Sequence, residues 1–213
     1  MKLYTFKGAP NARRVTMFVA EKGIDLAMDE VDLANRAQLS DEYAQVNPYL
    51  QVPALELDDG SVLTESIAIC LYLERIHPEP ALMGSSPQQQ AEILMWDRRM
   101  ELNGQMAIAD AFRNSNPFFE GRAMSGPDNL EQIPALAERG RLRAERFFER
   151  LDELLADRPF VAGDDFSLAD ITAYVAVDFA RVIKLRPGAD QPNLVRWYEA
   201  VGSRSSAVAT AMS

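Results

Sequence analysis

The sequence predicts an α/β domain with the element order βαβ–ββα, followed by an all-α helical domain. Three observations indicate this division: short β-prone runs alternate with helical patterns at the start of the chain, a proline-rich stretch follows, and the rest shows only helical periodicity. We therefore expect the α/β domain over residues 1–77, a linker over 78–87 and the all-helical domain over 88–213.

Composition restricts the class of protein. The chain has 213 residues, 47% of them hydrophobic, which is enough to bury a substantial core. Its 22 Lys+Arg and 32 Asp+Glu give a net charge of −10, so nucleic acid and anionic lipid surfaces are not expected as partners. No signal peptide or membrane-length apolar stretch is present in the sequence, and we expect a cytoplasmic protein with no membrane partner.

One cysteine and one histidine limit the redox and metal chemistry. Cys70 cannot form an internal disulfide, and His77 cannot complete a Cys/His metal cluster with it because further ligands are lacking. We therefore expect no metal. Because Cys70 lies among apolar residues in a helical pattern, we interpret it as a buried small hydrophobic residue.

The first elements form a βαβ unit. Val15, Phe18 and Val19 recur at i, i+3 and i+4, which predicts an amphipathic helix that ends before Gly23. The crossover through this helix favours parallel pairing of the strands on either side. The expected elements are a strand over 2–6, a helix over 11–22, a strand over 26–32 and an irregular helix over 34–47.

A hairpin and a buried helix complete the α/β domain. Two short strands, 54–57 and 61–63, flank Asp58-Asp59-Gly60, and Asp-Gly is a strong hairpin signal. The helix over 65–76 is apolar around most of its circumference, so we expect it to be buried on more than one side. Later helices are expected over 88–114, 134–156, 168–185 and 193–202.

Two short motifs could bind a ligand. In Gln51-Val52-Pro53, an X-Pro bond precedes a strand, and a cis bond there would turn the main chain of Val52 outward to pair with an extended peptide. An ordinary trans proline at a strand edge is the alternative. Thr64-Glu65-Ser66 begins the buried helix, where main-chain N–H groups bind carboxylates and Glu65 can bind an ammonium group. A plain helix start is the alternative there.

These motifs occur together in a recognisable order. Val52–Leu55, the Asp-Gly hairpin and Leu63–Ile69 resemble the glutathione-binding core of the glutathione S-transferase superfamily. Phe166–Ile171 is similar to the N-capping box of that family, in which Ser and Asp cap each other's backbone donors, and Pro192–Tyr198 is similar to its late helix. The resemblance covers essentially the whole chain in order.

The resemblance implies a thioredoxin-like N-terminal domain, a homodimer, and glutathione as a co-substrate. It implies that Val52 pairs with the cysteinyl backbone of glutathione beside a cis Pro53. It also implies that Glu65 and Ser66 hold the γ-glutamyl end and that Gln51 reaches the glycyl carboxylate. With Asn11, these are the expected glutathione-binding residues.

The group that stabilises the thiolate is not the usual one. Family members place a Tyr, Ser or Cys at the end of the first strand or the start of the first helix, whereas residues 8–14 here contain none of these. The side-chain amide of Asn11 and the N-terminus of the helix that begins near Pro10 remain, since both favour an anion. A plain N-cap is the alternative role for Asn11, and Tyr4 and Thr5 are the nearest hydroxyls. We expect Asn11 to be the catalytic residue.

The second substrate is expected to bind at an aromatic and polar stretch of the helical domain. Where the family builds its electrophile pocket, the sequence has Phe112, Arg113, Asn114 and Ser115, of which the last three could instead belong to a plain helix end. The sequence thus predicts a glutathione transferase that conjugates glutathione to a small electrophile in detoxification. Two alternatives are a glutathione-dependent peroxide or disulfide reductase and a non-catalytic glutathione-binding scaffold.

Overall fold

The structure is a computed structural model that describes residues 1–211, which form two compact units. Unit 1 comprises residues 1–80, 124–128 and 205–211, and unit 2 comprises residues 81–123 and 129–204. The last two residues of the predicted helical domain, 212 and 213, lie outside the described range. Within residues 1–211, no helix has the length and apolar character needed to cross a membrane.

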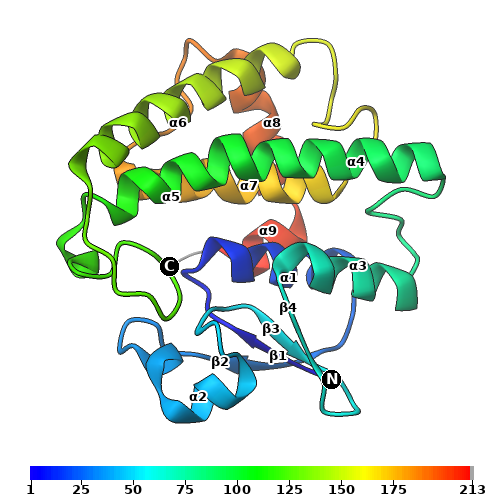
Figure 1. Cartoon of the computed structure of the whole chain (residues 1–213). Helices are drawn as coiled ribbons and strands as arrows, with labels where there is room; N and C mark the ends of the chain where they lie inside the picture. Colours follow the sequence, from blue (N-terminus) through cyan, green and yellow to red (C-terminus); the bar gives the residue numbers. More distant parts are fainter. Residues whose placement is uncertain (212–213) are drawn as a thin grey trace. The chain divides into compact units, whose positions relative to one another are not determined.

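Unit 1 has the predicted order βαβ–ββα and contains a four-stranded mixed sheet (Figure 1). The strand order is β2-β1-β3-β4, with β1 parallel to β2 and antiparallel to β3, and β3 antiparallel to β4. The elements are β1 (Lys2–Thr5), α1 (Pro10–Glu21), β2 (Ala27–Glu30), α2 (Asp41–Val46), β3 (Ala54–Glu56), β4 (Val62–Thr64), α3 (Ser66–Ile76) and α9 (Ser205–Ala209).

The alternation of side chains along β1 places its neighbours on two faces. Leu3 pairs in register with Leu55 of β3, and both are fully buried on the face that α1 and α3 cover (Figure 1). Tyr4 points to the other face, where its ring contacts Tyr43 of α2 edge-on at 6.1 Å. The two layers of helices therefore hold the sheet from both sides.

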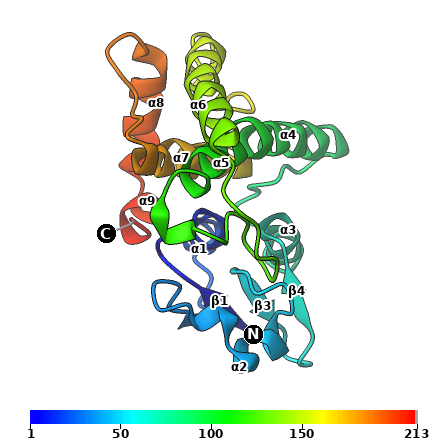
Figure 2. The ribbon, with the colours of Figure 1, turned by 60° about the vertical axis from the view of Figure 1, so that its left-hand side comes forward.

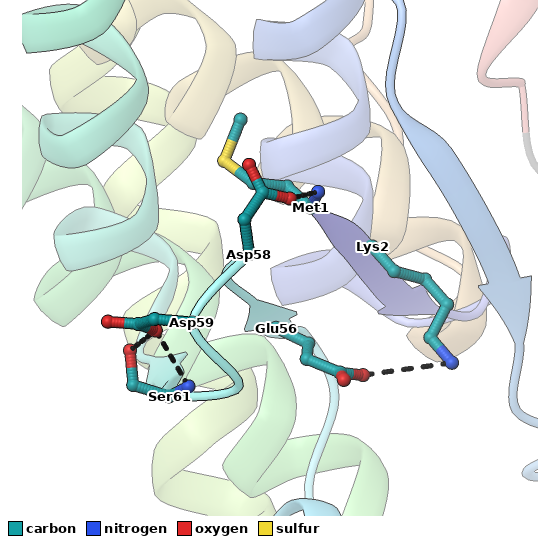
Figure 3. Close-up of polar contacts among 6 residues, drawn as sticks. All are labelled: Met1, Lys2, Glu56, Asp58, Asp59 and Ser61. Atoms are coloured by element: carbon teal, nitrogen blue, oxygen red, sulfur yellow. Dashed lines mark hydrogen bonds and ion pairs between the residues drawn. The ribbon is translucent and has the colours of Figure 1, made fainter.

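The β3–β4 hairpin turns at residues 58–60, and Figure 3 shows the polar contacts around this turn. Asp59 Oδ1 accepts hydrogen bonds from the N–H (2.9 Å) and Oγ (2.6 Å) of Ser61, and these bonds lower the pKa of Asp59. The N-terminal ammonium group of Met1 pairs with Asp58, and Lys2 Nζ lies 3.7 Å from Glu56 Oε2. The predicted Asp-Gly turn is present.

Unit 2 is all-helical, as predicted, and Figure 2 views its helices from a second side. The predicted helix over 88–114 is interrupted by a π-helical segment, Glu101–Gln105. Within this segment, a Cβ on Gly104 would lie 2.5 Å from the ring of Phe147, so the close packing of α6 requires glycine there. The helices are α4 (Pro87–Met100), α5 (Met106–Arg113), α6 (Pro134–Leu154), α7 (Leu168–Phe179) and α8 (Pro192–Gly202).

Helix α7 forms the centre of unit 2, and all its residues except Asp178 are buried. Its predicted extent, 168–185, is too long, because a 3₁₀ turn over Ala180–Ile183 follows and Lys184 then adopts a left-handed conformation at φ 58°. A left-handed residue ends the helical path. The predicted capping box between Ser167 and Asp170 is present at the start of the helix.

Asp170 connects three segments of unit 2. Its Oδ1 accepts hydrogen bonds from Val161 N (2.9 Å) and Trp197 Nε1 (3.0 Å), and its Oδ2 accepts two from Ser167, from N and from Oγ, each 3.1 Å long. The side chain is fully buried. Loss of hydration on burial raises the pKa of Asp170 to about 6, although these donors act in the opposite direction.

Candidate functional site

A pocket in unit 1 gathers the ligand-binding residues expected from sequence. All six predicted glutathione-binding residues line it, although they come from three separate stretches of the chain. Three residues without a predicted role complete the lining: Asn47, Tyr49 and Thr64. The six are Asn11, Gln51, Val52, Pro53, Glu65 and Ser66.

Two helix N-termini meet at this pocket. Helix α1 begins at Pro10 and α3 begins at Ser66, and Ser66 Oγ donates a 3.0 Å hydrogen bond to the main-chain oxygen of Asn11. Neither helix has a side-chain hydrogen bond at its N-cap. Because the N–H groups and the dipole at a helix N-terminus favour negative charge, the pocket suits an anionic ligand at two points.

Glu65 occupies a strained position at the start of α3. It is the N-cap residue of the helix and has φ 67° and ψ 120°, a conformation that residues with a Cβ rarely adopt. Its side chain is exposed. Such strain costs on the order of 1–3 kcal/mol and is found mainly where function requires it. The backbone thus presents a carboxylate at the edge of a site that otherwise attracts anions.

Asn11 is the second residue of α1, and its side chain is exposed at the pocket. The N-cap of this helix is Ala9, so the alternative interpretation of Asn11 as an N-cap is wrong. Pro10 occupies the first turn, as expected, since it has no N–H to satisfy there. Arg14 Nη1 lies 3.5 Å from Asn11 Oδ1, and Arg14 is 1% exposed. A buried cationic side chain therefore lies next to the amide.

The hydroxyls of Tyr4 and Thr5, the alternatives to Asn11, do not line the pocket. Tyr4 Oη donates a 2.8 Å hydrogen bond to Glu56 Oε2, towards the hairpin end of the sheet. Thr5 is buried in β1, and its Oγ1 has no hydrogen-bond partner among residues 1–211. The structure thus leaves Asn11 as the polar side chain that α1 contributes to the pocket.

The Val52–Pro53 peptide bond is cis. Two side chains fix the main chain of Gln51, the residue before this dipeptide. Its main-chain oxygen accepts hydrogen bonds from Tyr43 Oη and Asn47 Nδ2, each 2.7 Å long. Burial raises the pKa of Tyr43 to about 12, so it stays a hydrogen-bond donor at neutral pH. Sequence reasoning misses both donors, because the one signal nearby, Asn47-Pro48, indicates only a helix end.

The side chain of Gln51 is engaged by another segment of unit 1. Its Nε2 donates to the main-chain oxygen and to Oγ of Ser125, both at 3.1 Å. Ser125 lies in Met124–Asp128, which is far away in sequence but belongs to the same compact unit.

The residues predicted to bind the second substrate lie in unit 2. The Phe112 ring contacts Phe119 at 5.1 Å, and the Arg113 guanidinium lies 4.4 Å from the centre of the Phe119 ring. Burial, with a contribution from Arg122, lowers the pKa of Arg113. The other two side chains bond to main chain: Asn114 Nδ2 to Asp110 O (2.9 Å) and Ser115 Oγ to Ala111 O (2.7 Å).

The pocket lacks a thiol. Cys70, the single cysteine of the sequence, is 1% exposed within α3 and does not line it. Within residues 1–211, no group of three or more His, Cys, Asp or Glu side chains could hold a metal ion.

Comparison with known proteins assigns this architecture to a family. Residues 9–76 match the model for the N-terminal domain of glutathione S-transferases, and residues 99–205 match the model for the C-terminal domain. The chain belongs to the glutathione S-transferase superfamily. The similarities to individual relatives extend over nearly the whole chain.

Glutathione S-transferase 2 of Saccharomyces cerevisiae is 31% identical over 97% of this chain and 87% of the relative. The crystal structure of Gtt2 from the same yeast has a TM-score of 0.90 at 29% identity and covers 99% of this chain and 100% of its own. The disulfide-bond oxidoreductase YfcG of Escherichia coli is 26% identical over 93% of this chain and 89% of the relative. The predicted family and fold, including the thioredoxin-like N-terminal domain, are confirmed. Members of the superfamily use glutathione as a substrate and typically dimerise.

Proposed function

We propose that this protein is a glutathione transferase that ionises the thiol of glutathione and adds it to a small electrophile. The observation that carries this proposal is the meeting of two helix N-termini, neither with a side-chain cap at its N-cap residue, at one pocket beside the exposed carboxylate of Glu65. Glutathione is a peptide with a zwitterionic γ-glutamyl end, a thiol and a second carboxylate. The pocket offers groups for the zwitterionic end and for the thiol, and Gln51 is the proposed partner of the second carboxylate.

Each group of the pocket has a role in this proposal. Glu65 binds the ammonium group of the γ-glutamyl end, while the N–H groups and hydroxyl at Ser66 bind its carboxylate. The main chain of Val52, beside the cis Pro53, pairs with the cysteinyl residue as an added strand. Among residues 1–211, none forms a main-chain hydrogen bond with Val52, which supports its role as a docking point.

The thiol is then placed near the N-terminus of α1. A free thiol has a pKa near 8.5, and lowering it by two units requires roughly 2.7 kcal/mol of preferential stabilisation of the thiolate. The N–H groups of the first turn of α1 and the amide of Asn11 are neutral donors that can contribute this. The thiolate attacks the electrophile, the S–C bond forms, the thiol proton passes to solvent, and the leaving group departs with its electron pair.

Glutathione-dependent disulfide reduction is a second candidate. It is supported by the similarity to a protein named a disulfide-bond oxidoreductase and by the absence of a Ser, Tyr or Cys side chain from the first turn of α1. In this reaction one glutathione thiolate attacks a mixed disulfide of glutathione. Glutathione disulfide forms and the other thiol is released, so no protein cysteine is needed.

The remaining features are proposed on the family pattern. Phe112, Arg113, Asn114 and Ser115 contribute to binding of the electrophile, and the protein acts in the cytoplasm. We propose a homodimer, supported by apolar side chains of α4 and the adjoining π-helical segment that are 40–43% exposed: Leu94, Met95 and Leu102. Light scattering coupled to size-exclusion chromatography tests the dimer.

Calorimetric titration with glutathione, together with the ultraviolet absorption band of the bound thiolate at neutral pH, tests the function. We expect binding with a thiolate band, and a loss of over tenfold in conjugation of an aryl halide in Asn11→Ala. Asn103→Ala is the matched control, because Asn103 is exposed and lies in unit 2. Turnover of mixed disulfides without conjugation would favour the second candidate. Binding without turnover would indicate a scaffold, and absence of binding would overturn the proposal.

A further inference from the structure

The 124–128 segment (Met124–Asp128) makes a specific contact with the pocket. Gln51 Nε2 donates to both acceptors of Ser125, the main-chain oxygen and Oγ, at 3.1 Å each. A main-chain oxygen can only accept, so this contact determines which end of the Gln51 amide faces the segment. The amide nitrogen is thereby directed towards Ser125 rather than towards a ligand.

A glycine is required for this approach. Gly126 has φ 111°, and a Cβ there would lie 3.3 Å from Gln51 Nε2 and 3.4 Å from the main-chain oxygen of Tyr49. Both neighbours belong to pocket-lining residues. A side chain at this position would be strained at φ 111° and would have to shift the Gln51 amide by a few tenths of an ångström, so this conformation of the segment favours glycine.

The hydrogen bonds to Ser125 compete with any ligand for the amide of Gln51. A tripeptide thiol has a carboxylate at the end away from its γ-glutamyl group, and that end needs a donor. Of the other side-chain amides that line the pocket, Asn47 already donates to the main chain of Gln51, and Asn11 lies at α1. A carboxylate that reaches Gln51 must therefore replace Ser125 as the acceptor. Since a hydrogen bond to a carboxylate is roughly twice as strong as one between neutral groups, the exchange is favourable.

We propose that the 124–128 segment competes with the glycyl carboxylate of a bound tripeptide thiol for the amide of Gln51. Ser125 and Gln51 thereby set how strongly the site prefers a tripeptide thiol over a shorter γ-glutamyl thiol. This inference rests on the proposed function. It adds Ser125 and Gly126, which lie outside the lining of the pocket, as residues that determine specificity.

The test compares two ligands by calorimetry: glutathione and γ-glutamylcysteine, which lacks the glycyl carboxylate. In Gly126→Val, which displaces the segment, we expect glutathione to bind about fivefold more tightly because the competing acceptors are lost. Affinity for γ-glutamylcysteine should not change, and the gain for glutathione should disappear in the Gln51→Ala background. Gly60→Val is the matched control, since Gly60 has φ 82° but no atom lies within 4 Å of the position that a Cβ would take there.

Ser125→Ala provides a milder variant that removes only the Oγ acceptor, and we expect about a twofold gain for glutathione. It decides the question if Gly126→Val does not fold, as judged by circular dichroism. Equal changes for the two ligands, or unchanged glutathione affinity in a folded Gly126→Val, would overturn this inference alone. If the unmodified protein does not bind glutathione, the proposed function fails and this inference fails with it.

Discussion

Helices α3 and α7 begin in opposite ways. At α7, Ser167 and Asp170 form a capping box, and the carboxylate of Asp170 also binds Val161 and Trp197 in the interior of unit 2. At α3, Glu65 is in a strained conformation and makes no side-chain cap. The start of α7 is thus capped by side chains, whereas the N-cap residue of α3 makes no such cap and lines a pocket.

Helix α8 shows that an absent local cap is not by itself a sign of a site. Its N-cap residue makes no side-chain hydrogen bond, but Leu194 N donates to Asp152 Oδ1 of α6 at 2.8 Å. A side chain from another helix therefore does the capping. At the start of α3, by contrast, the N-cap residue makes no side-chain cap, its backbone is strained, and Glu65 and Ser66 both line the pocket.

The largest expected effect is a loss of stability at the capped start of α7. Asp170→Ala should lower the free energy of unfolding by about 4 kcal/mol, because buried donors of Val161, Ser167 and Trp197 lose their acceptor. Urea unfolding measures this. Asp165→Ala, at an exposed carboxylate, is the control and should change stability little. Glutathione affinity of the folded variant should be unchanged, and a parallel loss of affinity would contradict a purely structural role.

The pH dependence of the unfolding free energy provides a second test at Asp170. Burial raises the pKa of Asp170 from 3.8 to about 6, so the folded protein binds more protons at this group than the unfolded chain does between these values. The part of its contribution to stability that is linked to protonation is therefore fully present below about pH 4 and is lost as the pH rises through about 6. The difference in unfolding free energy between the unmodified protein and Asp170→Asn should fall by about 3 kcal/mol from about pH 4 to about pH 7. A difference that rises with pH would show that hydrogen bonding to the carboxylate dominates.

At the start of α3, substitution of the N-cap residue should raise stability rather than lower it. Glu65→Gly should raise the free energy of unfolding by about 1 kcal/mol, since glycine relieves the strain at φ 67°. It should also weaken glutathione binding about 30-fold, because the ammonium group loses its carboxylate. Glu65→Gln separates the two effects, with a similar loss of affinity and no gain in stability. Thermal unfolding and calorimetry measure both, and a stability loss in Glu65→Gly would contradict the strain argument.

The smallest expected effect is at the support of the pocket loop. Tyr43→Phe removes one of the two donors to the main-chain oxygen of Gln51, while Asn47 remains. We expect a loss of about 1 kcal/mol in stability and about threefold in glutathione affinity. Tyr72→Phe on α3 is the matched control. An unchanged affinity would show that Asn47 alone holds the loop.

Much of the fold could be predicted because its signals are local. The Asp-Gly turn and the apolar pattern of the helix that became α3 each depend on neighbouring residues, so both elements lie where they are expected. The end of α7 is predicted too late because the apolar pattern continues beyond it into a 3₁₀ turn. Periodicity does not distinguish these two kinds of turn over four residues.

By itself, the sequence determined the family, the order of the elements and the set of residues, such as Glu65 and Ser66, whose chemistry suits a zwitterionic thiol. The tertiary structure decided which groups those residues contact. Ser66 bonds to the main chain of Asn11, and Tyr43 bonds to the main chain of Gln51. The side-chain amide of Gln51 bonds to Ser125. The physical reason is that helices and turns depend on nearby residues, whereas a pocket depends on hydrogen bonds between residues 55 or 74 positions apart, which no local pattern specifies.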